Sequence, residues 1–219
     1  MKRYFWIVPI ACSVALLQGC APALIGAGGV AAVASAEDRR TTGTQVEDEG
    51  IELRAGNRLG ERFGDKAHLN VTAFNRWVLL TGEVPDEAAR AEAEKLVAAV
   101  PNVRGVSNEA QVAGVSSLTS RASDSFITSK VKARFVDARK FNPVHVKVVT
   151  EAGVVYLLGV VTEKEADDAV EVARTTGGVR KVVKIFEYCK PTDEVCRPRP
   201  KAPADTPKPP AEASGKPAS

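Results

Sequence analysis

Two histidines and four cysteines are the side chains of this 219-residue chain best suited to catalysis, metal binding or redox chemistry. His68 and His145 each stand just before a run with the pattern of a strand, at equivalent places in two similar stretches. A residue that recurs in this way serves the fold, so we expect neither histidine to be a catalyst or a metal ligand. Asp167 and Asp168 fall on a predicted helix and are expected to be solvated. The sequence therefore predicts no catalytic residue, no metal site and no cofactor, and we do not expect an enzyme.

Cys20 stands in a segment that predicts attachment of lipid. Residues 1–19 contain two basic residues and then an apolar run too short to span a bilayer, which is typical of a secretory signal peptide. The letters LQGC that end at Cys20 resemble the lipobox of bacterial lipoproteins, in which the signal is cut before the cysteine and the cysteine is acylated. Because residue 21 is alanine rather than the aspartate that commonly retains such proteins in the inner membrane, we expect a lipid-anchored protein on the periplasmic side of the outer membrane. An ordinary secreted protein with an unmodified cysteine is the alternative.

Cys189 and Cys196 are the cysteines left for redox chemistry, because Cys12 belongs to the predicted signal peptide and Cys20 to the lipid anchor. Two thiols this close in an oxidising compartment favour a disulfide, and a pair of free thiols is the alternative. A zinc site is not expected here, since no histidine or second cysteine pair lies nearby in the sequence.

Both ends of the chain lack the apolar periodicity that a core requires. We expect residues 20–46 to be an acylated N-terminus with a flexible linker, and the proline-rich residues 191–219 to be a disordered tail. The whole chain has 30 basic and 27 acidic residues, and removal of the signal peptide takes away two basic ones. This near-neutral balance argues against a nucleic-acid partner.

The middle of the chain is a duplication. The stretch HLNVTAFNRWVLLTGEVPDEAARAEAE, which begins at His68, aligns without a gap with HVKVVTEAGVVYLLGVVTEKEADDAVE, which begins at His145. Each copy shows the periodicity of an amphipathic helix, two strands joined by a short turn, a second helix and a third strand. This αββαβ order predicts an α+β fold with two similar domains, residues 47–114 and 122–190. In each domain, two helices are expected to cover one face of a small mixed three-stranded sheet.

The pattern also predicts where individual elements begin and end. In the second copy, Asp124 or Ser125 is expected to cap the first helix, which would bury Ile127, Val131 and Phe135. The short turns between the first two strands are expected at residues 75–76 and 152–153. The third strands are expected at residues 103–112 and 179–188.

On these residues the chain resembles lipoproteins with two BON domains. The resemblance rests on the segments VLLTGEV and VYLLGVV, the acidic, alanine-rich helix after each, and the paired valines Val103/Val106 and Val179/Val182. The segment DRRTTGTQVEDE is similar to the linker of the family of division- and outer-membrane-stress-associated lipid-binding lipoproteins. The resemblance implies a non-enzymatic outer-membrane protein that supports envelope integrity. It also implies that the first helix of the second domain binds anionic phospholipid.

The two copies differ in the charge of this helix. Residues 44–66 carry six acidic and four basic residues, a net charge of −2, whereas residues 119–142 carry six basic and two acidic residues, a net charge of +4. Phe126, which takes the place of Gly50, lies roughly 130° from the centre of the apolar stripe of its helix. A cationic helix with an aromatic side chain off its buried face is typical of a membrane-surface contact.

We therefore expect four residues to contact anionic phospholipid, with Lys132 and Lys140 as lesser contributors. The four are Phe126, Lys130, Arg134 and Arg139. The alternative for Phe126 is packing against the inter-domain linker or the first domain, with the lysines solvated. The alternative for the whole protein is a periplasmic scaffold that docks outer-membrane assembly proteins or the cell wall. Neither hypothesis involves a nucleic acid or a small-molecule substrate.

Overall fold

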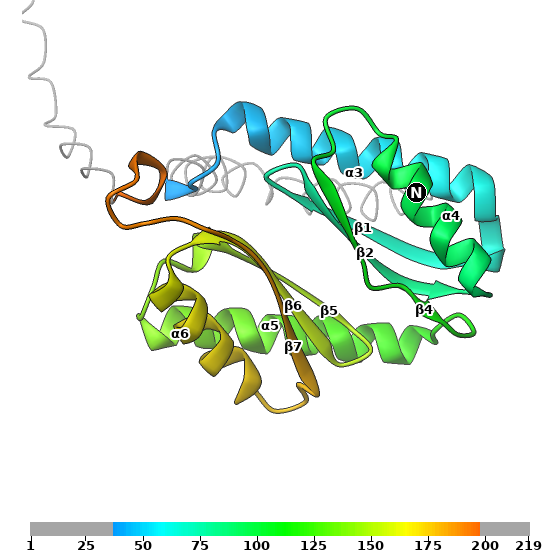
Figure 1. Cartoon of the computed structure of the whole chain (residues 1–219). Coiled ribbons are helices and arrows are strands. Elements are labelled where there is room, and N and C mark those ends of the chain that lie inside the picture. Colours follow the sequence, from blue (N-terminus) through cyan, green and yellow to red (C-terminus); the bar gives the residue numbers. More distant parts are fainter. Residues whose placement is uncertain (1–36, 198–219) are drawn as a thin grey trace, which may run out of the picture.

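The structure, a computed structural model, describes residues 37–197 and is shown in Figure 1. The predicted signal peptide, Cys20 and most of the proline-rich tail lie outside the described residues. None of the helices in the described part of the chain is long and apolar enough to cross a membrane.

The first domain follows the predicted αββαβ order. Its elements are α3 (Thr42–Phe63), the 3-10 turn η1 (Gly64–Lys66), β1 (His68–Phe74), β2 (Trp77–Val84), α4 (Glu87–Ala98), β3 (Gly105–Asn108) and β4 (Gln111–Val112). β1 and β2 pair antiparallel, whereas β3 and β4 both pair parallel with β2. α3 begins within the stretch predicted to be a flexible linker, because the Thr41 hydroxyl accepts a hydrogen bond from the backbone N–H of Thr44 and caps the helix.

The second domain repeats this arrangement. Its elements are α5 (Leu118–Ala138), η2 (Pro143–His145), β5 (Val146–Glu151), β6 (Val154–Val161), α6 (Glu163–Arg174), β7 (Lys181–Tyr188) and η3 (Glu194–Cys196). β5 and β6 pair antiparallel, and β6 and β7 pair parallel. The predicted fold class, two tandem α+β units with small mixed sheets, is confirmed.

The third strand of the first domain is shorter than predicted. The sequence predicts one strand over residues 103–112, but the pairing with β2 is interrupted at Glu109 and Ala110. The side-chain oxygen of Asn108 accepts a hydrogen bond from the backbone N–H of Ala110 at 3.2 Å, and the Ala110 side chain enters the core. This local bend separates β3 from β4, whereas the equivalent strand β7 is continuous over eight residues.

The apolar stripes of the two long helices are buried as predicted. Ile127, Val131 and Phe135 of α5 pack into one core with β5 and α6. The equivalent residues of α3 are buried in the core of the first domain and are Ile51, Ala55 and Leu59. Burial of each large apolar side chain contributes about 1.5–3 kcal/mol, so these stripes attach the helices to their sheets.

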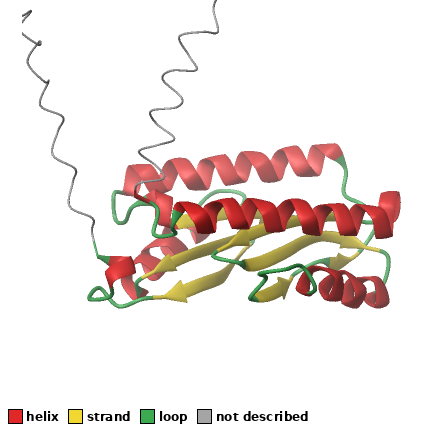
Figure 2. Ribbon diagram, turned by 90° about the horizontal axis from the view of Figure 1, so that it is seen from above, coloured by secondary structure: helices red, strands yellow, loops and turns green. Residues whose placement is uncertain are grey.

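The sheet faces that the helices leave uncovered pack against each other. Figure 1 shows α3 and α4 on one side of the strands and α5 and α6 on the other, and in Figure 2 the two longest helices run along the length of the molecule. Along β2, Val78 and Leu80 face the helices of their own domain, and Leu79 between them faces the second domain. The buried residues of this shared core are Phe74, Leu79, Tyr156, Leu158 and Val160. The two domains are therefore one packed body with its sheets inside.

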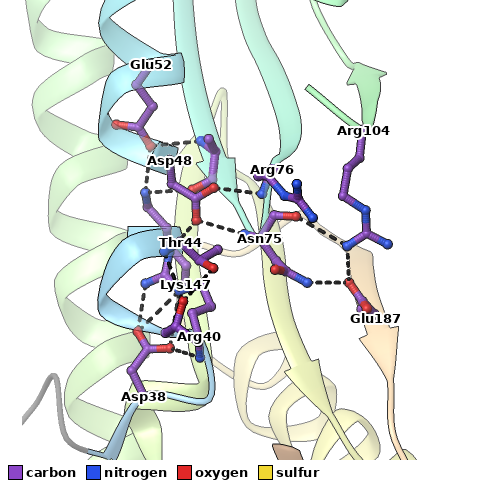
Figure 3. A network of polar contacts seen from close by, with 12 residues as sticks. Asp38, Arg40, Thr44, Asp48, Glu52, Asn75, Arg76, Arg104, Lys147 and Glu187 are labelled. Carbon is purple, nitrogen blue, oxygen red and sulfur yellow. Dashed lines mark hydrogen bonds and ion pairs between the residues drawn. The ribbon is translucent and has the colours of Figure 1, made fainter. Parts of the chain in front are cut away.

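A buried aspartate in each long helix holds the hairpin turn of its domain. The carboxylate of Asp48 accepts hydrogen bonds from the backbone N–H groups of residues 75 and 76 at 2.8 and 2.7 Å (Figure 3). Asp124 accepts from residues 152 and 153 at 2.9 and 2.8 Å. All four turn residues have positive φ angles, as the tightest hairpin turns require. The predicted turn positions are confirmed, and each turn is anchored to a helix.

The prediction that Asp124 or Ser125 caps the first helix of the second domain is wrong. α5 begins at Leu118, and the Ser117 hydroxyl caps it by accepting a hydrogen bond from the backbone N–H of Ser120 at 3.2 Å. Asp124 lies inside the helix, and its carboxylate binds the hairpin instead of the helix terminus. An aspartate near the start of a helical pattern often caps the helix, but here the Asp124 carboxylate accepts its hydrogen bonds from the backbone of a distant turn.

Polar contacts also join the two domains, and Figure 3 shows them beside Asp48. Lys147 of β5 lies 2.8 Å from the carboxylate of Glu52 of α3. Glu187 of β7 accepts hydrogen bonds from Asn75 at 2.7 Å and from Arg104 at 3.2 Å. These contacts are exposed or half-buried, so each contributes little to stability, but together they help to orient one sheet relative to the other.

Candidate functional site

Phe126 lies on the outer face of α5, away from the core. Its side chain is 64% exposed, and Nζ of Lys130, one turn later, lies 4.8 Å from the centre of its ring. A cation over an aromatic face is attracted by the ring quadrupole, so the ring and the charge lie together at the surface. This exposure does not fit the alternative in which the inter-domain linker or the first domain covers Phe126.

Two further apolar side chains are exposed on the same helix. Leu118 is 80% exposed and Val136 is 60% exposed. They are five helical turns apart and therefore point in the same direction, about 80° from Phe126. Neither residue is among the predicted lipid contacts, although their spacing of 18 residues places them on one face of the helix. Together with Phe126 they form the outer face of α5, a name kept below for Leu118, Phe126 and Val136.

The equivalent positions of α3 carry small or polar residues. Thr42, Gly50 and Gly60 stand where Leu118, Phe126 and Val136 stand in the second copy. α3 does expose Val46 and Leu53, but its segment has the negative net charge noted above. An exposed apolar face beside excess positive charge is thus a property of α5, not of the repeat.

Some of the basic residues predicted to bind lipid have hydrogen bonds or ion pairs within the protein, and others do not. Arg134 donates hydrogen bonds to the carbonyl of Val172 at 3.1 Å and to the hydroxyl of Thr176 at 2.9 Å, so it ties α5 to the end of α6. Lys130 donates to the carbonyl of Gly177. Among the described residues, Arg139 and Lys132 are exposed and have no hydrogen bond or ion pair, whereas Lys140 lies 3.3 Å from Asp168.

The start of the described chain is tied to the second domain through Glu165. Arg39 donates hydrogen bonds to both Glu165 oxygens at 2.7 and 3.0 Å and to the carbonyl of Val160 at 2.8 Å. Burial acts to raise the pKa of Glu165, but the hydrogen bonds from Arg39 and from the Thr162 N–H outweigh it and lower this pKa to about 2. Burial and the charge of Arg39 lower the pKa of His145, whose ring lies 3.4 Å from Glu165.

Stability is expected to fall as the pH drops from 4.5, the ordinary pKa of Glu165, towards its folded value of about 2. A carboxylate whose pKa is lowered on folding stabilises above its unfolded pKa, here by at most about 3 kcal/mol because solvent screens part of the interaction, and it loses that contribution as it is protonated. Glu165→Gln should therefore be less stable than the wild type at pH 7 and nearly equal to it at pH 2, measured by urea unfolding. An equal difference at both values of pH would show that Arg39 does not hold this carboxylate ionised.

Cys189 and Cys196 lie after β7, near the end of the described chain. Their Cα atoms are 6.2 Å apart, within the range that a disulfide spans, and the structure pairs their sulfur atoms. Cys196 is buried in η3, and Cys189 packs against the core between the sheets. The disulfide stays a prediction, and the geometry suits it.

Comparison with known proteins identifies both halves of the chain. The BON domain family matches residues 47–114 and 123–190. The chain is 41% identical over 175 residues to the outer membrane lipoprotein DolP of Haemophilus influenzae, a match that covers 78% of this chain and 90% of that protein. It is 36% identical over 153 residues to the 21 kDa hemolysin of Actinobacillus pleuropneumoniae, covering 69% and 79%. It is 33% identical over 117 residues to the osmotically-inducible protein Y of Escherichia coli, covering 52% and 58%.

The chain therefore belongs to the DolP family of dual BON-domain lipoproteins, and it is an outer-membrane lipoprotein. The family resemblance stated from the sequence is confirmed, as is the duplication. The family is not one of enzymes, which agrees with the expectation for this chain.

Proposed function

We propose that this protein is anchored through acylated Cys20 on the periplasmic side of the outer membrane, where the outer face of α5 contacts anionic phospholipid and supports envelope integrity. The observation that carries the proposal is the exposure of Phe126 beside cations on α5, since the equivalent position of α3 is a glycine in an acidic segment. Lys130, Lys132 and Arg139 would meet lipid phosphates, and Arg134 would contribute least because its hydrogen bonds serve α6.

The magnitudes suit a tethered protein. Burial of a phenylalanine among acyl chains contributes about 1.5–3 kcal/mol, and each lysine or arginine near an anionic surface about 1 kcal/mol. A free protein with so few contacts would bind weakly. An acyl anchor keeps the local lipid concentration high, so the same contacts suffice to orient the domains on the surface.

Vesicle flotation tests the proposal directly. A soluble form that begins at Ala21 should float with anionic vesicles at low salt, should float less at high salt, and should stay in solution with zwitterionic vesicles, because the cations contribute through screened attraction. A protein that stays in solution with both kinds of vesicle would exclude the proposed contact and favour the scaffold hypothesis.

Lipidation of Cys20 is expected in the full chain expressed in a Gram-negative host. Mass spectrometry of the mature protein should show Cys20 as the first residue with added acyl mass, because the segment that ends in Gly19 and Cys20 resembles the lipobox. Cys20→Ser should release the protein into the soluble periplasmic fraction. A wild-type protein with an uncleaved N-terminus or without added acyl mass on Cys20 would disprove the anchor.

A groove between the domains favours the scaffold hypothesis as the second candidate. Its volume is about 380 Å³, and its lining includes Phe74, Trp77, Leu158, Ile185 and Phe186 as well as the basic Arg104 and Lys184. An apolar lining with a few charged groups suits a segment of another protein, such as an outer-membrane assembly factor.

A further inference from the structure

Three side chains with metal-binding atoms meet where the two domains touch. His68 of β1 lies 3.1 Å from Glu83 of β2, measured from Nδ1 to Oε2. Glu151 of β5 joins them from the second domain, and one ligand atom from each of the three lies within 4.8 Å of the others. Glu83 and Glu151 are only 7% and 8% exposed. Two carboxylates that are this close and this deeply buried repel each other unless a cation or a proton stands between them.

The neighbouring groups orient these carboxylates without neutralising them. Oε2 of Glu83 also accepts a hydrogen bond from the backbone N–H of Ser116 at 3.2 Å, and Oε2 of Glu151 accepts one from the Asn70 amide at 2.9 Å. In the described part of the chain, no lysine or arginine forms an ion pair with either glutamate. Arg121, the basic residue of the adjoining cavity, directs its guanidinium to Ser116 instead.

A cavity of about 350 Å³ opens beside the cluster. His68 and Glu151 both line it, together with Asn70, Asp124 and Thr128. The cavity provides a route for an ion and space for water beside two of the three ligands. It is an observation independent of the ligand distances, and it points to the same place.

The second copy of the repeat lacks this arrangement. His145 is the equivalent of His68, but Val160 stands where the first copy has Glu83, and Phe74 stands where the second has Glu151. Since the second copy folds with a valine at the position of Glu83, and the first copy folds with a phenylalanine at the position of Glu151, the fold requires neither carboxylate. Buried charged groups that folding does not require are candidates for binding.

We infer that His68, Glu83 and Glu151 bind a divalent transition-metal ion, with zinc(II) as the best fit, and that the ion fastens the first domain to the second. Imidazole nitrogen and carboxylate oxygen are ordinary zinc ligands, and zinc is often held by three protein ligands with water at a fourth position. The histidines were not expected to bind metal because they occupy equivalent places in the two copies. The two glutamates join His68 only in the folded chain.

Thermal unfolding of the full chain, purified in detergent and stripped with EDTA, tests this inference. Addition of zinc chloride should raise the melting temperature by roughly 8 °C once zinc is in roughly hundredfold excess over its dissociation constant. Glu151→Gln keeps the side-chain volume but removes a charged ligand, and His68→Asn removes the imidazole. Both variants should lose the shift, whereas His145→Asn, the matched control in the second copy, should keep it in full.

The contrary outcomes are equally clear. A wild-type protein whose melting temperature does not respond to zinc has no such site, and the inference is then wrong. A shift that persists in both Glu151→Gln and His68→Asn would place the zinc elsewhere on the chain. If Glu151→Gln fails to fold in EDTA, the partly exposed His68→Asn decides, and visible absorption of bound cobalt(II) in the wild type but not in this variant gives a second readout.

Discussion

Phe126→Glu is expected to abolish flotation with anionic vesicles while leaving the fold intact by circular dichroism. The side chain is 64% exposed, so no core contact is lost. In the bound state the ring would be buried among acyl chains, and its loss removes about 1.5–3 kcal/mol of binding free energy. This corresponds to roughly tenfold to hundredfold weaker binding before the repulsion of the new negative charge is counted. Flotation across a series of protein concentrations measures this change.

The chain offers a matched control in its other long helix. Leu53 is 66% exposed on α3, and Leu53→Glu should bind vesicles as the wild type does. Lys132→Glu is the cleaner test of charge, because Lys130 also holds the carbonyl of Gly177. It should weaken binding more at low salt than at high salt. If Phe126→Glu binds normally, or if Leu53→Glu fails equally, α5 is not the lipid contact.

Asp124→Ala is expected to destabilise the protein by about 3 kcal/mol. The variant removes a charged acceptor of two hydrogen bonds that the backbone N–H groups of the hairpin turn donate, and hydrogen bonds of this kind contribute about 1.5–3 kcal/mol each. It also leaves two N–H groups without a partner in a turn with positive φ angles. The melting temperature should fall by roughly 10 °C in a chain of this size.

Asp137→Ala is the control for this prediction. Asp137 lies on the same helix but is exposed and has no polar partner among the described residues, so its loss should change stability by less than about 0.5 kcal/mol. If Asp124→Ala lowers the stability of the protein no more than Asp137→Ala does, the turn residues form the hairpin without help from the helix.

The sequence by itself determined the elements and their order. Period 3.6 and period 2 reveal which face of a helix or strand is apolar, so the duplication, the two hairpins and the buried stripe of Ile127, Val131 and Phe135 were all predictable. A further signal was present but unused. The run VYLLGVV and the first three residues of VLLTGEV are apolar on both faces, which is typical of strands covered on both sides.

Only the tertiary structure decided which distant atoms meet. From the sequence Asp124 resembles a helix cap, but in the structure its carboxylate accepts hydrogen bonds from a hairpin turn 28 residues later. Arg134 resembles a lipid ligand, but it donates a hydrogen bond to Thr176, 42 residues away. His68 has a glutamate partner from each domain only because the sheets pack face to face. Periodicity reports the direction of a side chain relative to its own element. Its partners depend on the packing of elements against one another, which no local pattern contains.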